Sequence, residues 1–98
     1  MAPNDQEILL YRYTPVLIRS EPSGTVSTLI SVAKKSQTFD PLKVIPGLMN
    51  VPQNHRNEAI KFEKFCIDEL GRTEKNIHNL YLFHLAESDR EDELIRYL

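Results

Sequence analysis

The sequence predicts an all-α chain, an α-solenoid fragment of about six antiparallel helices paired as helical-hairpin repeats. Apolar residues recur three or four positions apart along most of the 98 residues, which is the spacing of one helix face. Several prolines and glycines, among them Pro22, Gly24, Pro41, Pro52 and Gly71, fall between these periodic runs, at points where helices start and stop. The pattern therefore indicates helices joined by short turns.

The clearest boundary is the hinge Leu70-Gly71-Arg72-Thr73. Gly71 can take the left-handed conformation that closes a helix, and Thr73 can accept a backbone N–H bond that starts the next one. Two helices joined so closely must fold back on each other, and such hairpins build scaffolds that bind rather than catalyse. The apolar positions that flank the hinge are Ala59, Phe62, Cys66 and Leu70 before it and Ile77, Leu80, Tyr81, His84 and Leu85 after it.

Two helices are expected before this hairpin, in the first third of the chain. The first covers residues 5–20 and is kinked at Pro15, because proline loses one backbone bond and crowds the carbonyl four residues earlier. The alternative is a break, with Thr14 capping a second short helix whose first residue is Pro15.

Residues 21–24 form a turn. An amphipathic helix follows over residues 25–35, because its apolar positions at i, i+3, i+4 and i+7 favour a helix over the competing strand.

The middle of the chain carries a strong helix start after a loop at residues 36–39. Asp40 can cap the helix, and Pro41 suits its first position. Pro46 lies inside this helix and predicts a second kink. Residues 50–54 form a further connection that contains a proline.

Three more helices complete the prediction. Helices over residues 55–70 and 74–86 flank the hinge, and Ser88 with Glu91 has the capping-box spacing that opens a last helix. A terminal solenoid repeat needs a polar outer face, so we expect residues 1–98 to be one segment of a longer solenoid. The apolar residues that end the chain are Leu94, Ile95, Tyr97 and Leu98.

Bulk composition narrows the classes of function. The net charge of −2 gives no basic field for nucleic acid. No apolar run approaches the roughly 20 residues that span a bilayer, so membrane association is expected only through partners. Cys66 is the only cysteine, so an internal disulfide or a cysteine-rich metal site is excluded.

The sequence indicates no catalytic, cofactor-binding or metal-binding residues. His78 and His84 are six residues apart, which places them on different helix faces, and His55 is remote from both. Cys66 falls on an apolar helix face, where a free cysteine is normally a small buried hydrophobe. The acidic residues between positions 87 and 93 suit a helix start better than a calcium loop. Those acidic residues are Glu87, Asp89, Glu91, Asp92 and Glu93.

A structural and interaction role is the leading hypothesis, and two alternatives stay open. One is a small hydrolase or redox enzyme that uses Cys66 and a histidine, which the reactivity of the thiol would reveal. The other is a generic helical-repeat adaptor similar to tetratricopeptide repeats, whose signature residues are missing here. Tyrosine and phenylalanine residues are expected mainly in the core, and exposed ones are the first candidates for a partner surface.

Three segments carry a resemblance to a known family. Residues 13–18 read YTPVLI, residues 39–50 read FDPLKVIPGLMN, and residues 59–79 read AIKFEKFCIDELGRTEKNIHN. They resemble the (F/Y)-(S/T)-P-V-L-I, D-P-x-x-(L/V)-I-P-(A/G)-L and A-I-x-(Y/F)…L-G-x-T-E-x-x-I-H-N segments of the vacuolar protein sorting-associated protein 18 family, in the same order. The last run, which contains the hinge, is the most specific.

The resemblance implies an α-solenoid of clathrin-heavy-chain-like repeats in a core subunit of the class C tethering complexes HOPS and CORVET. It implies a role in membrane tethering and fusion at endosomes and the lysosome or vacuole, and so in vesicle-mediated protein transport. The implied partners are the other class C subunits, with an indirect link to Rab GTPases and SNAREs. The implied location is cytoplasmic and peripheral on late endosomal and lysosomal membranes. The β-propeller and RING of full-length members are not expected in residues 1–98, and the fragment can self-associate through exposed apolar ends.

Overall fold

Helices account for all the regular secondary structure in the residues that the computed structural model describes, which are 5–49 and 51–97. The all-α prediction is therefore confirmed, and no strand occurs within these ranges. The elements in chain order are α1 (Asp5–Ser20), α2 (Pro22–Lys35), the 3₁₀ turn η1 (Pro41–Lys43), α3 (Ile45–Leu48), the 3₁₀ turn η2 (Gln53–His55), α4 (Arg56–Asp68), α5 (Lys75–Glu87) and α6 (Glu91–Tyr97).

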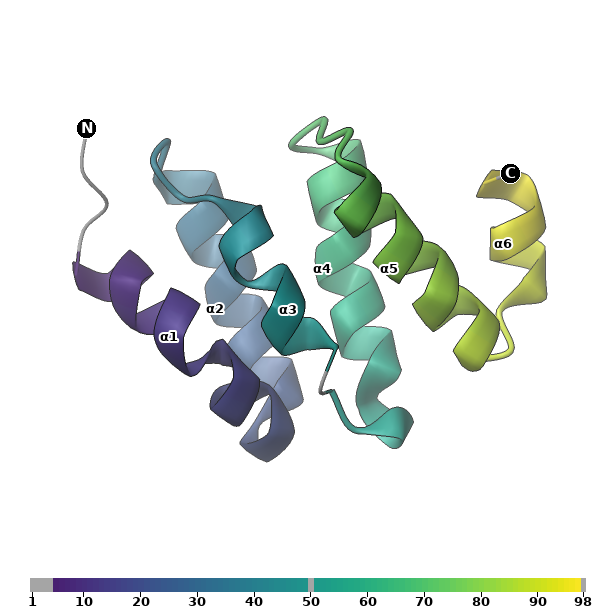
Figure 1. Cartoon of the computed structure of the whole chain (residues 1–98), viewed down its shortest axis with the longest axis horizontal. Coiled ribbons are helices and arrows are strands. Elements are labelled where there is room, and N and C mark those ends of the chain that lie inside the picture. Colours follow the sequence, from purple (N-terminus) through teal and green to yellow (C-terminus); the bar gives the residue numbers. More distant parts are fainter. Residues whose placement is uncertain (1–4, 50, 98) are drawn as a thin grey trace.

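The helices form hairpins that lie side by side in a row (Figure 1). Helices α1 and α2 make one hairpin, α4 and α5 make another, and α2 packs against α4 where the two hairpins meet. Helix α3 rests on α1, and α6 packs on α5 at the opposite end of the row from α1. This arrangement is the predicted stack of helical hairpins.

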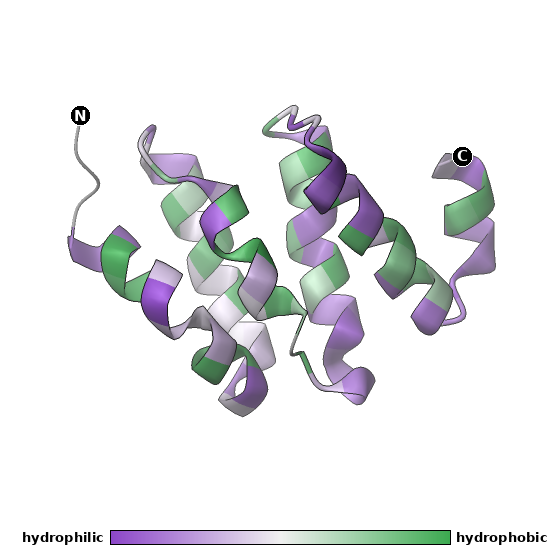
Figure 2. Cartoon of the chain, in the orientation of Figure 1, coloured by the Kyte–Doolittle hydropathy of each residue, from purple (hydrophilic) through white to green (hydrophobic). Residues whose placement is uncertain are grey.

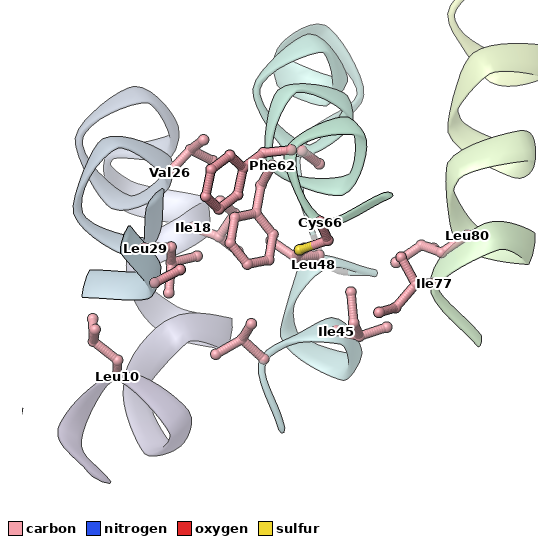
Figure 3. Close-up of a cluster of buried hydrophobic side chains, with 14 of the residues drawn as sticks. Leu10, Ile18, Val26, Leu29, Ile45, Leu48, Phe62, Cys66, Ile77 and Leu80 are labelled. Carbon is pink, nitrogen blue, oxygen red and sulfur yellow. The ribbon is translucent and has the colours of Figure 1, made fainter. Parts of the chain in front are cut away.

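One hydrophobic core runs from α1 to α5 (Figure 3). Phe62 of α4 is fully buried in it, together with Ile18 of α1, Leu29 of α2 and Leu48 of α3. Ile77 carries the cluster on to α5. Hydrophobic and hydrophilic residues alternate along the ribbon of the helices (Figure 2), as the three- and four-residue spacing predicts.

Helix α1 is continuous through Pro15, so the alternative of a break at this point is wrong. Thr14 does not cap a new helix. Its side chain is buried, and its hydroxyl donates to the carbonyl of Leu10 one turn earlier. Helix α3 approaches α1 closely here, because a Cβ atom on Gly47 would lie 3.0 Å from the Pro15 nitrogen and from Thr14 Cγ2. Glycine at position 47 therefore permits the contact between α1 and α3.

The predicted turn at residues 21–24 is wrong. Helix α2 already begins at Pro22, where the missing N–H of proline costs nothing because first-turn N–H groups have no partner inside a helix. The backbone N–H of Thr25 donates to the carbonyl of Glu21 at 2.9 Å, which closes the first turn. The proline therefore acts as a helix start rather than as a turn residue.

The helix start at Asp40 is confirmed, but the single kinked helix expected after it is wrong. Asp40 Oδ1 accepts a hydrogen bond from the backbone N–H of Leu42 at 3.1 Å, and Pro41 opens η1. The chain then restarts at α3, with Pro46 in its first turn. Proline cannot donate to the carbonyl four residues earlier and crowds it, so it is accommodated at a helix start instead of a kink. Asn50, which the prediction placed in the next connection, lies outside the described residues.

The hinge turns the chain as predicted and Gly71 closes α4 as predicted, but the cap of α5 differs. Gly71 has a φ of 66°, and the N–H of Arg72 donates to the carbonyl of Cys66 at 3.0 Å, which closes α4. Thr73 is not the cap of α5, because Glu74 occupies that position and makes no side-chain capping bond. Helix α4 ends at Asp68 rather than at residue 70, so the connection between the two helices is longer than the sequence suggests.

The predicted capping box at Ser88 is also wrong. Ser88 ends α5, where its N–H donates to carbonyls of the last turn. Asp89 then takes a positive φ of 56°, and α6 begins only at Glu91. Leu98, which was expected in the last helix, lies outside the described residues.

Replacing Gly71 with alanine is expected to lower the free energy of unfolding by about 1–2 kcal/mol, because the left-handed backbone disfavours a Cβ atom. No other atom lies within 4 Å of that Cβ, so the effect is one of backbone conformation alone. Gly24→Ala is the matched control. It lies inside α2 and should stabilise the chain by about 0.5–1 kcal/mol. Equal urea midpoints for the two variants would contradict this account of the hinge.

Candidate functional site

Cys66 is a core residue of α4. Its side chain is fully buried on the inner face of α4, close to Leu48 in the cluster of Figure 3. Burial raises the pKa of the thiol to about 12, and the nearby Arg72 guanidinium offsets only part of that rise. Nucleophilic cysteines need a lowered pKa and an accessible sulfur. This environment favours neither, and the predicted burial of Cys66 on an apolar helix face is confirmed.

A buried acid and base join α4 to α5, and the sequence did not predict this pair. Glu63 of α4 is fully buried, and its Oε2 lies 2.7 Å from Nδ1 of His84 on α5, which is 1% exposed. Burial raises the pKa of Glu63, while the hydrogen bond to His84 and its charge lower it. Oε1 of Glu63 has no hydrogen-bond partner within the described residues. The pair therefore needs both members, because a lone buried carboxylate would be costly.

A second buried acid ties α1 to the loop after α2. Glu7 is fully buried and accepts hydrogen bonds from the hydroxyls of Ser36 and Thr38. The hydroxyl of Tyr11, one turn further along α1, accepts a bond from the backbone N–H of Asp40 at 2.8 Å. These polar contacts fix α1 against the loop that follows α2, and so stabilise the α1–α2 hairpin. The only sequence signal for Glu7 was its position three residues before Leu10, on the buried face.

The remaining candidates occupy separate places. His78 is partly buried and pairs through Nε2 with the carbonyl of Arg72 at 3.0 Å, whereas His55 is exposed at the end of η2. Among the acidic residues near α6, Glu93 pairs with Arg90, whose hydrogen bond lowers the pKa of Glu93. Within residues 5–49 and 51–97, no three histidine, cysteine or acidic side chains are grouped as metal ligands would be.

An apolar groove of about 580 Å³ lies between α3 and α5. Its walls include Ile45, Pro46 and Met49 on one side and Leu80 and Phe83 on the other. Among the described residues that line the groove, Arg56 is the one that carries a charge, and its guanidinium is paired with Glu87 at 3.0 Å. A groove with this lining suits contact with another apolar surface better than acid–base chemistry.

Helix α1 carries a second apolar surface on the side away from the core. We call it the α1 outer face, and it consists of Ile8, Leu9, Tyr13, Val16 and Leu17. All five side chains are exposed, and Leu9 and Val16 are each more than half exposed. Of the aromatic residues expected mainly in the core, Phe62, Phe65 and Tyr81 are buried. Tyr13 and Phe83 are exposed instead, which makes them the first candidates for a partner surface. The described residues thus expose apolar surface on α1 and in the groove between α3 and α5.

Comparison with known proteins identifies the family. The model of the second half of the VPS18 alpha-solenoid domain matches residues 1–98. The chain belongs to the VPS18 family. It is 35% identical, over 94 residues, to the vacuolar protein sorting-associated protein 18 homolog of Danio rerio. The match covers 92% of this chain and 9% of that relative, and no solved structure is similar to the chain.

Membership of the VPS18 family agrees with the geometry. The resemblance seen at residues 13–18, 39–50 and 59–79 is confirmed, and so is the α-solenoid fold. The family-specific run at residues 70–79 contains the α4–α5 hinge and the start of α5. No helix of the described residues is long and apolar enough to cross a membrane.

His84→Ala is expected to lower the free energy of unfolding by about 3–5 kcal/mol at pH 7, because it leaves Glu63 buried without its partner. His55→Ala is the matched control. That side chain is exposed, so its loss should change stability by less than about 0.5 kcal/mol.

The cost of His84→Ala should shrink as the pH falls toward 4.5. A raised pKa means that folded Glu63 binds a proton more tightly than the unfolded chain does. The stability that comes from this tighter proton binding is fully present below the pKa that Glu63 has in the unfolded chain. It is lost as the pH rises through the pKa that Glu63 has in the folded chain. Removing His84 removes the effects that lower this pKa, so the variant should lose stability with rising pH more steeply than the parent. Urea titrations from pH 4.5 to 8 measure this, and a cost independent of pH would refute the role of Glu63.

Cys66 of the folded chain should react with a disulfide reagent at pH 8 roughly a thousandfold more slowly than in the urea-unfolded chain, because its pKa is near 12. As Cys66 is the only cysteine, the total absorbance change reports this residue alone. Rates within tenfold of each other would instead favour the cysteine-enzyme alternative.

Proposed function

We propose that this chain is a structural and interaction segment of a core subunit of the class C tethering complexes HOPS and CORVET. In this role it contributes to membrane tethering and fusion at endosomes and the lysosome or vacuole, and so to vesicle-mediated protein transport. The observation that carries the proposal is the match of the VPS18 solenoid model to residues 1–98. The curated relative is named as a vacuolar protein sorting protein, which supports the same role.

The geometry suits a segment that spaces and presents surfaces. Hairpins stacked along an axis 39 Å long fix the separation between the elements at either end. Rigidity comes from the continuous core and from the Glu63–His84 pair across α4 and α5. Such a stack can hold other subunits at a set distance without bound cofactor or metal. The family and the fold point to a structural, non-enzymatic subunit.

The partners in this proposal are the other class C subunits, through which the segment is linked indirectly to Rab GTPases and SNAREs. The chain would then lie on the cytoplasmic side of late endosomal and lysosomal membranes, attached through the complex. We assign residues 1–98 to one α-solenoid segment. Zinc binding of the RING type is not part of the proposal, because the single Cys66 cannot supply the ligands of such a site.

A segment exchange tests this function. The matching segment of the Danio rerio relative is replaced by this chain, and the chimera is produced in cells that lack the relative. The chimera should co-purify with the other class C subunits, because the two segments are 35% identical over 94 residues. It should also restore delivery of an endocytosed dye to lysosomes to near the level reached with the intact relative.

The matched control is the same chimera with His84→Ala, which weakens the stack without touching its surface. This variant should lose both co-purification and dye delivery. A chimera that joins the complex at normal levels but leaves dye delivery at the level of the deficient cells would contradict the tethering role.

A further inference from the structure

Helix α1 has two opposite apolar faces, and the described residues cover only one of them. The inner face carries Leu10, Thr14 and Ile18, which are buried against α2 and α3. Leu9 and Ile18 are nine residues apart, which places them about 180° apart around the helix. A helix that is apolar on both sides is normally buried on both sides.

The α1 outer face exposes five apolar side chains, and no helix of the described residues packs over it. Leu9, Tyr13 and Val16 follow one another at i, i+4 and i+7, with exposures of 55%, 46% and 52%. Ile8 and Leu17 widen this stripe on either side. The spacing is that of a helix-packing seam, so a second helix can lie along about three turns of α1. Contiguous exposed apolar surface of this kind marks an interaction site.

One charge lies within this surface and indicates the chemistry of its occupant. Arg12 points to the same side as Val16, since the two are one turn apart, and it is exposed. It makes no ion pair with any residue in 5–49 or 51–97, whereas Arg56, Arg72 and Arg90 all do. A helix that packs here can therefore place a carboxylate opposite Arg12 beside an apolar stripe.

We propose that the α1 outer face is the seam on which the first half of the VPS18 alpha-solenoid domain packs, through a helix with an apolar stripe and a carboxylate opposite Arg12. This rests on the proposed role of the chain as a segment of a larger solenoid subunit. The matching family model is the second half of that domain, and the chain covers 9% of the curated relative. Helix α1 is also the end of the row opposite to α6 (Figure 1), where a preceding layer would join.

Photo-crosslinking in the chimera described above tests this assignment. A benzophenone amino acid replaces Tyr13, which keeps an aromatic ring at the centre of the outer face. Irradiation should produce crosslinks to peptides from the first half of the relative's solenoid domain. The same amino acid at Ile95, which is 69% exposed on α6, serves as the control position and should give no crosslink to that half.

Variants on either side of the probe sharpen the test. Leu9→Lys with Val16→Lys should reduce the yield at position 13 at least about tenfold, because two exposed apolar side chains that the proposed seam would bury become charged. Met49→Lys with Ile95→Lys changes two apolar side chains that are 68% and 69% exposed and lie away from the α1 outer face, so it should leave that yield unchanged. Arg12→Glu should reduce the yield less than the Lys pair, since it changes one rim charge. Thermal melts of the isolated 98-residue chain should show the same midpoint for both double variants and the parent.

Crosslinks from position 13 to a second copy, to another subunit or to nothing would overturn the assignment. Equal yields with the two double variants would also overturn it. This readout lies within one polypeptide and does not depend on dye delivery. A chimera that crosslinks as expected but does not restore delivery would therefore refute the tethering function and leave the packing seam standing.

Discussion

The burial of α4 on two sides is the constraint on which the rest of the structure depends. This helix packs against α2 on one side and α5 on the other. Phe62 and Cys66 therefore enter the main core, while Ile60 enters a smaller cluster with Tyr81 and Leu85 of α5. A helix that is packed on both sides has few solvent-exposed positions for charged side chains. Glu63 is tolerated only because His84 approaches it from α5, and the hinge at Gly71 sets the return path that makes this approach possible.

Periodicity predicted the helices because the residues on the buried face of a helix recur every three or four positions, whichever element packs against that face. The ends of the helices were less predictable. The sequence predicts a turn at Pro22 and a kink at Pro46, yet both prolines lie in first turns of helices, where proline fits without strain. The sequence predicts that Thr73 and Ser88 start α5 and α6. Instead, Glu74 precedes α5 without a side-chain capping bond, and the N–H of Ser88 closes the last turn of α5. A short cap motif fits several positions near a helix end, and only the packing decides which one is used.

The buried acids show where sequence reasoning ends. Glu7 and Glu63 both lie in helical register with apolar neighbours, but a carboxylate in that register is normally expected at the surface. Their partners are far along the chain: Thr38 is 31 residues from Glu7, and His84 is 21 residues from Glu63. The sequence placed His84 on an apolar face but could not name the acid that it meets. That pairing becomes visible only when α4 and α5 are set side by side.

Helix α4 also explains why the exposed side of α1 matters. The two-sided apolar pattern of α4 is satisfied because it has neighbours on both sides. Helix α1 has the same two-sided pattern but has α2 and α3 on one side only. Since burial of apolar area is the main force that holds stacked helices together, an uncovered apolar side marks the direction in which a stack gains stability by adding a layer. The fold and the proposed role then have one physical basis, because the interaction that joins one hairpin to the next within the chain is also suited to join the chain to a larger assembly.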